Sequence, residues 1–137
     1  MDKEKILAKW KEIKPYNQVW YRDDVALITG YRQQEKKYLI SVIKDGHIEC
    51  HDVNEIDLKP IQLDYAGEML RKLQPNKVTP FECVFADKDE LNKVSVAFCN
   101  NYCYVIKDGN EIYSDVVCEF HVIQNILSEL FGYKLFI

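Results

Sequence analysis

Apolar residues recur every three or four positions toward the C-terminal end of the sequence. At about 100° per residue they form one stripe of a helix, made of Phe120, Ile123, Leu127, Leu130 and Phe131 and widened by Val122 and Ile126. Ser114 and Asp115 offer side-chain oxygens to the unpaired N–H groups of the first turn, and Gly132 suits the left-handed conformation that ends a helix. The segment 114–135 therefore predicts a turn followed by a core-forming helix.

A second amphipathic helix is predicted near the N-terminal end, within a unit that covers residues 1–16. Its apolar side consists of Ile6, Leu7, Trp10 and Ile13. Lys14-Pro15 ends it, because proline disfavours a helical conformation in the residue before it. The opposite side is rich in lysine, but acidic residues interrupt the basic run. We interpret this side as a solvated face rather than a membrane or nucleic-acid patch.

Between residues 17 and 63 the apolar period changes to two, which is typical of strands. Short strands are predicted over 19–21, 25–28, 38–43 and 47–53. For the turn between the last two, side-chain alternation favours a three-residue loop with Gly46 as a bulge. That pairing puts Ile48 and Cys50 on the apolar face and leaves His47, Glu49 and His51 in solvent. Short, bent, antiparallel strands predict a small SH3-like barrel over 17–63.

The remainder of the chain predicts a helix, a linker and a second sheet. Asp64 can cap a helix that ends near Leu73, and Pro75 and Pro80 bracket a linker, so that 64–80 forms helix and linker. The unit 81–137 then reads as a four-strand antiparallel meander packed on the C-terminal helix. Its strands are expected at 81–86, 93–99, 102–107 and 111–114, and 133–137 can return as an edge strand. The predicted fold class is α+β, with its two halves divided at about 74–80.

Composition excludes some classes of function. The net charge is −4, and residues 1–60 carry 11 basic against 11 acidic residues while 61–137 carry 7 against 11. Neither half has the basic excess of a protein that binds nucleic acid by neutralising phosphates. The five cysteines are odd in number and lie in strand-like segments, which suits a reducing cytoplasm. No apolar run is long enough for a leader or a membrane span, so we expect a soluble, cytoplasmic protein without membrane partners.

Histidines and cysteines offer two weak candidates for chemistry. His47, Glu49 and His51 project from one face of a strand, where they could hold a divalent metal, but a solvent-facing polar strip is the favoured interpretation and no metal site is predicted. Cys118 and His121 lie one helical turn apart, as a nucleophile and base would, yet no third group orients them. We expect no enzyme and no cofactor, and a cysteine-dependent hydrolase is a remote alternative.

Two further cysteines flank the expected Asn100-Asn101 turn. Hairpin pairing would put Cys99 opposite Tyr102 and Phe98 opposite Cys103. The two sulfurs would then lie on opposite faces of the sheet, which argues against a zinc knuckle.

A polar ridge runs along the C-terminal helix opposite its apolar stripe. It consists of His121, Gln124, Asn125 and Ser128, a choice that favours neither solubility nor helix propensity. Two interpretations compete. The side chains are either buried and hydrogen-bond the neighbouring barrel or loops, or exposed as a binding site for a partner. We favour the structural tie, because buried amides and imidazoles are stable when paired.

An alternative binding face would use aromatic and basic residues of the predicted barrel. The candidate contacts for nucleic acid are Trp20, Tyr21, Tyr31, Arg32, Lys36 and Lys37. Nucleic-acid binding is a possible function from this pattern but not the favoured one.

Two short stretches carry a resemblance to known proteins. The C-terminal segment from His121 to Ile126, continuing through Leu130, Gly132 and Leu135, and the segment Leu58 to Leu63 resemble the signatures of small, uncharacterised proteins of Bacteroides-type gut bacteria and their phages and prophages. Those proteins close with a His-x-Leu-Gln-Asn-Leu helix and carry a Pro-Ile-Pro-Leu-Thr run before a short helix. Here Gln62 and Asp64 replace the second proline and the threonine.

The resemblance brings no known activity, and it implies an origin in a mobile element and a setting inside the host cell. With no enzyme motif in the sequence, we expect a non-enzymatic accessory protein that binds a host or phage protein in host takeover or defence evasion.

Overall fold

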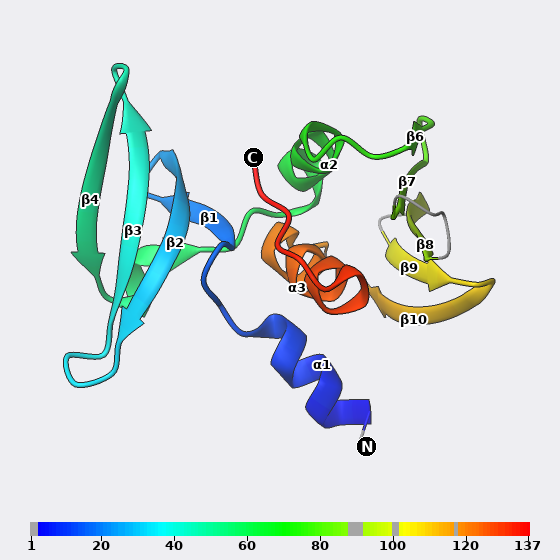
Figure 1. Cartoon of the computed structure of the whole chain (residues 1–137), viewed down its shortest axis with the longest axis horizontal. Coiled ribbons are helices and arrows are strands. Elements are labelled where there is room, and N and C mark those ends of the chain that lie inside the picture. Colours follow the sequence, from blue (N-terminus) through cyan, green and yellow to red (C-terminus); the bar gives the residue numbers. More distant parts are fainter. Residues whose placement is uncertain (1–2, 88–91, 100–101, 117) are drawn as a thin grey trace.

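The computed structural model describes residues 3–87, 92–99, 102–116 and 118–137. These residues form three α-helices and two antiparallel sheets, with α3 between the sheets (Figure 1). The predicted α+β class is confirmed. The helices are α1 (Lys3–Lys11), α2 (Leu63–Lys72) and α3 (Phe120–Phe131).

The first sheet, called sheet A here, has the strand order β4-β3-β2-β1-β5. Its strands are β1 (Gln18–Tyr21), β2 (Asp24–Arg32), β3 (Lys37–Lys44), β4 (His47–Val53) and β5 (Leu58–Lys59), with a 3₁₀ turn at Glu55–Asp57. One face buries a core of Val19, Ala26, Ile28, Ile40, Val42, Val53 and Leu58. The outer strands β4 and β5 do not pair with each other in the described register. The sheet is therefore open, and barrel closure stays a prediction.

The β3–β4 turn differs from the predicted bulge. Lys44 pairs directly with His47, so the loop has two residues, and Asp45 and Gly46 both have positive φ, of 51° and 79°. Such a turn matches the twist of the flanking strands. Side-chain alternation would decide the loop length only if β4 buried one full face, but β4 is an edge strand whose residues are exposed up to Cys50. Ile48 consequently lies opposite Ile43.

The second sheet, sheet B, confirms the predicted meander and adds a short strand. Its order is β10-β9-β8-β7-β6, with β6 (Lys77–Val78), β7 (Glu82–Ala86), β8 (Lys93–Cys99), β9 (Tyr102–Lys107) and β10 (Asn110–Asp115). Cys99 pairs with Tyr102 and Phe98 with Cys103, as predicted. Cys103 is buried while Cys99 is exposed, so the two sulfurs lie on opposite faces. The Asn100-Asn101 turn itself lies outside the described residues.

The helix ends were predicted unevenly. Gly132 ends α3 with φ 78°, as expected. The predicted start is wrong, because Ser114 and Asp115 still belong to β10 and α3 begins at Phe120. The Asp115 carboxylate instead accepts hydrogen bonds from the Val116 N–H and the Tyr113 hydroxyl. Likewise α2 begins at Leu63 with Gln62 before it, so Asp64 is not its cap.

The segment 133–137 is not the predicted edge strand. Its main chain bonds side chains rather than another strand, with Gln124 Nε2 donating to the Leu135 oxygen and the Ile137 N–H donating to Gln18 Oε1. Because these groups are already satisfied by glutamine amides, a sheet edge is not needed to pair them.

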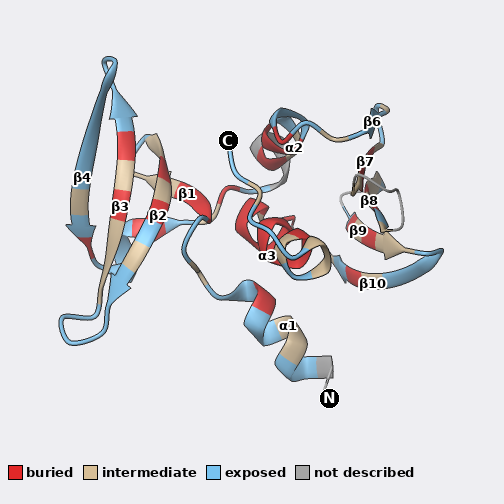
Figure 2. Ribbon diagram, in the orientation of Figure 1, coloured by how far each residue is buried: buried red, intermediate tan, exposed pale blue. Residues whose placement is uncertain are grey.

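The larger core surrounds α3 and joins distant parts of the chain (Figure 2). It is formed by α2, sheet B, α3 and Trp10 of α1. Ala66, Met69 and Leu70 of α2 are buried in this core. The predicted division at 74–80 left α2 on the side of the barrel, whereas α2 packs in the core of α3 and sheet B. Because Trp10 belongs to the same core, the two cores are not separated at one point of the chain.

Candidate functional site

Asn125 on α3 is buried and bonds the segment that leads from α1 to β1. Its Nδ2 donates to the main-chain oxygens of Trp10, at 2.7 Å, and Glu12, at 2.9 Å. Its Oδ1 accepts a hydrogen bond from Asn17 Nδ2 at 2.8 Å. One amide thus satisfies two carbonyls that the end of α1 leaves without helical partners.

Gln124 links the first strand of sheet A to the C-terminal segment. Its Oε1 accepts from the main-chain N–H of Gln18 at 2.8 Å, and its Nε2 donates to the Leu135 oxygen at 2.9 Å. The Gln18 side chain in turn bonds both main-chain groups of Ile137. Residues from both ends of the chain therefore meet at one buried amide.

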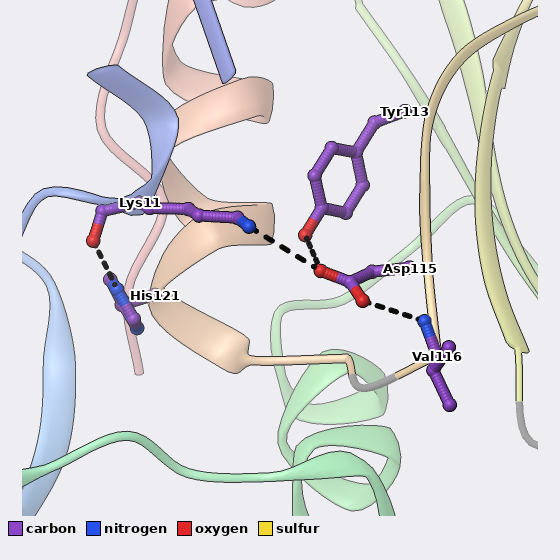
Figure 3. A network of polar contacts seen from close by, with 5 residues as sticks. All are labelled: Lys11, Tyr113, Asp115, Val116 and His121. Carbon is purple, nitrogen blue, oxygen red and sulfur yellow. Dashed lines mark hydrogen bonds and ion pairs between the residues drawn. The ribbon is translucent and has the colours of Figure 1, made fainter. Parts of the chain in front are cut away.

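His121 fixes the end of α1. Its Nε2 lies 3.0 Å from the Lys11 oxygen, and the Lys11 ammonium lies 3.7 Å from Asp115 (Figure 3). Because a carbonyl accepts, Nε2 carries the proton. Nδ1 is buried without a partner among the described residues. Burial lowers the pKa of His121, against a smaller opposing effect of the Lys11 bond, so the ring is neutral at pH 7.

The polar ridge is accordingly a structural tie between α3 and the N-terminal segment, as favoured from the sequence. The competing interpretation, an exposed recognition patch, is wrong for His121, Gln124 and Asn125, since all three side chains are buried. Ser128 is half-buried at the end of this row.

Cys118 lacks the features of a nucleophile. It is fully buried, and a hydrogen bond with the Cys103 thiol together with burial raises its pKa. A thiol, rather than the reactive thiolate, is therefore present at neutral pH. The arrangement gives no support to a cysteine-dependent hydrolase.

The aromatic and basic residues proposed for nucleic acid do not share a face. Trp20 packs against the core around α3, whereas the neighbouring Tyr21 packs against the core of sheet A. Arg32 is paired with Asp52 at 3.3 Å. Tyr31 packs against a tyrosine of β3, and Lys36 and Lys37 lie at the β2–β3 turn. The six residues therefore lie in different parts of the molecule. They do not form one continuous surface on which bases could stack.

The strip of His47, Glu49 and His51 lies along the edge strand β4. It lies on the face that carries Val42 and Ile40, since Glu49 pairs with Val42 and His51 with Ile40. His51 packs beside the Tyr21 ring. Across the described ranges, no cluster of three or more metal-ligating side chains is present.

An apolar groove lies on the outer face of sheet A, which here means the face opposite its own core, beside the C-terminal segment. Its volume is about 480 Å³, and it is lined by Gln18, Val25, Leu27, Ser41, Ile43, Ile48 and Ile137. Ile43 and Ile48 lie opposite each other beside the tight turn, and they are 75% and 72% exposed. The groove offers no paired acid and base, and its chemistry is that of apolar contact.

Comparisons with protein families, curated proteins and solved structures give no match. In the part of the chain that the structure describes, no helix is long and apolar enough to cross a membrane.

Sequence reasoning missed two groups of residues. Asn17 and Gln18, the buried partners of the polar ridge, lie in the predicted barrel unit just before its first predicted strand, where their amides gave no distinct signal. Ile48 was assigned to the core by the bulge argument. The Asp45-Gly46 pair, a strong signal for a two-residue turn, could have placed both isoleucines on the outer face.

Proposed function

We propose that this chain is a non-enzymatic accessory protein of a phage or prophage, which acts in the cytoplasm of a bacterial host by binding a host or phage protein. The contact surface is the apolar groove on the outer face of sheet A. The bent sheet with its 3₁₀ turn and returning β5 supports an SH3-like scaffold for that groove. Host takeover or defence evasion is the role that the resemblance to phage proteins favours.

The observation that carries the proposal is the exposure of Ile43 and Ile48. Burying an isoleucine side chain contributes roughly 1.5–3 kcal/mol relative to leaving it in water. Two such residues side by side, next to Val25 and Leu27, form an apolar surface that a partner can cover. Isolated exposed apolar residues need no explanation, but a lined groove does.

The backbone beneath the groove supports tight binding. Ile43 and Ile48 sit on paired strands, and Val25 and Leu27 belong to the next strand of the same sheet. Groups already held by a sheet lose little conformational entropy when a partner binds. A partner that inserts two or three apolar side chains would therefore gain most of their burial free energy.

The test is a capture experiment with matched variants. Immobilised wild-type protein, Ile43→Asp and Ile56→Asp are exposed to host lysate, and a partner found by mass spectrometry is then purified and titrated against each. Ile56 is 84% exposed and lies outside the groove, so it is the control. We expect Ile43→Asp to weaken binding at least about tenfold and Ile56→Asp to leave it unchanged. Equal affinities for both variants would refute the groove as the site.

A salt-titrated mobility-shift assay with DNA and RNA separates this function from nucleic-acid binding. Affinity that falls steeply with salt would favour phosphate contacts and contradict the proposal.

A further inference from the structure

The two sheets have four edge strands, and one of them differs from the others. β5 and β6 have two residues each, and the pairing of β10 is interrupted between Glu111 and Tyr113. β4 has seven residues and pairs with β3 in one unbroken register. It is also the outermost element of its sheet in Figure 1. Short strands and bulges protect an edge against further pairing, and β4 has neither protection.

The open main-chain groups of β4 follow from its turn. In a two-residue hairpin the pair that closes the loop, here Lys44 and His47, is hydrogen-bonded, and bonded pairs then alternate along the strands. Odd-numbered residues of β4 therefore bond β3. The N–H and C=O groups of Ile48, Cys50 and Asp52 point away from β3, toward the open edge.

We propose that β4 pairs antiparallel with β4 of a second copy of this chain, with Cys50 at the two-fold axis. This register pairs all seven residues of the strand and brings the three outward-pointing residues of each copy opposite one another, for about six main-chain hydrogen bonds. The two five-stranded sheets become one continuous sheet.

Charge complementarity favours the second copy over an unrelated strand. With Cys50 at the axis, Glu49 lies opposite His51 of the partner subunit, and the same pair recurs on the other side of the axis. A carboxylate opposite an imidazole N–H stabilises a cross-strand pair. Moving the axis by one residue would place Glu49 opposite its own copy or His51 opposite its own copy, so the sequence selects one register.

The inference does not depend on the proposed function. It uses the edge of sheet A, and neither Glu49 nor Cys50 lines the apolar groove. Ile43→Asp tests partner capture, and changes in β4 test self-association. Either proposal can therefore fail while the other holds.

The first experiment is thiol crosslinking of the purified full chain with bismaleimidoethane. Cys50 is exposed, and at the axis it would lie about 5.5 Å from its copy, measured between Cα atoms. We expect a crosslinked dimer on a denaturing gel. It should disappear in Cys50→Ser and persist in Cys99→Ser, which removes an exposed cysteine of sheet B. Crosslinking that depends on Cys99 alone would overturn the proposal.

The second experiment measures the dimer without a crosslinker. Sedimentation equilibrium of the wild type should give the mass of two chains. Glu49→Lys should weaken association at least about tenfold, because the ammonium cannot accept the hydrogen bond that each Glu49 carboxylate would receive from an imidazole N–H. The charge-swapped double variant Glu49→Lys/His51→Glu should restore it. Thermal unfolding of each variant separates loss of pairing from loss of folding.

A proline variant tests the main-chain contact itself. Cys50→Pro removes an edge N–H without touching the ladder to β3, so we expect a folded monomer. A wild-type monomer at every concentration, or a dimer that survives Cys50→Pro, would overturn the pairing of β4.

Discussion

The surroundings of α3 and the end of the β3–β4 hairpin place side chains against their usual preferences, in opposite directions. On α3, His121, Gln124 and Asn125 are buried. At the hairpin end, Ile43 and Ile48 are exposed. In the first region nearly all buried polar side-chain atoms form hydrogen bonds within the chain. In the second region apolar side chains are exposed to water.

The comparison shows that burial of a side chain depends more on the contacts available to it than on its polarity. A buried amide with its hydrogen bonds made is stable, whereas the same amide without them costs about 1–3 kcal/mol. Ile43 and Ile48 stay exposed because they lie at the end of the β3–β4 hairpin, on the face of sheet A opposite its core. The first arrangement holds the fold together, and the second leaves the apolar surface to which we propose that a partner binds.

The largest contrast is expected from isoleucines in the two regions. Ile123→Ala removes fully buried methyl groups in the core around α3 and should lower the free energy of unfolding by roughly 2–5 kcal/mol. Ile43→Ala should change it by less than about 0.5 kcal/mol. Urea denaturation of both variants measures the difference, and similar losses would contradict the division into a packed and an open region.

Next in size is the loss of the Asn125 amide. Asn125→Ala leaves the oxygens of Trp10 and Glu12 and the amide of Asn17 without this partner, so we expect a cost of roughly 1–3 kcal/mol. Ser128→Ala, on the same side of α3 but half-exposed, is the control and should cost less than about 0.5 kcal/mol. An unchanged melting temperature in Asn125→Ala would show that the tie contributes nothing.

The pH dependence of stability gives a smaller effect. The folded pKa of His121 is lowered by burial from 6.5, so below about pH 6.5 the unfolded chain binds a proton that the folded chain does not. Stability should therefore be full above this pH and fall as the pH drops, by no more than about 1.4 kcal/mol per pH unit. His121→Gln keeps a donor near the position of Nε2 but cannot titrate. Its stability should depend less on pH between 7 and 5, and equal slopes would contradict the assignment.

Thiol labelling compares exposed and buried parts of the wild-type chain. Because no residue is substituted, the experiment involves no change in the free energy of unfolding. Cys50 and Cys99 are exposed, and Cys83, Cys103 and Cys118 are buried. Burial raises the pKa of Cys83, and the Cys103 contact together with burial raises that of Cys118. N-ethylmaleimide should add two labels to the native chain and five in denaturant, counted by intact mass. Rapid labelling of Cys118 in the native chain would revive the nucleophile hypothesis.

Local signals in the sequence were sufficient for much of the fold. The period of α1, the alternation in sheet B and the glycine that ends α3 each depend on neighbouring residues, and each was predicted. The errors arose where a choice depended on distant packing. The start of α3 was misplaced because Asp115 serves β10 and Lys11 rather than a helix cap.

The candidate site was less predictable than the fold. The four ridge residues could be identified as unusual, and a structural role was favoured. Their partners could not be identified, since Asn17 lies 108 positions from Asn125 and no local pattern connects them. Exposure of Ile43 and Ile48 depends on how much of their face of sheet A the rest of the chain covers, and the alternation along a strand carries no information on this.

The hydrogen bonds between α3 and the segment before β1 also constrain the order in which the chain folds. They join positions 106 to 115 residues apart, so the loop that they close is among the longest in the molecule. Closing such a loop costs more entropy than forming a hairpin, and hairpins form within microseconds. During synthesis the strands of sheet A can pair while α3 is still inside the ribosome. The main-chain oxygens of Trp10 and Glu12 and the side chain of Asn17 then stay hydrated until residues 121–125 leave the ribosome and bond them.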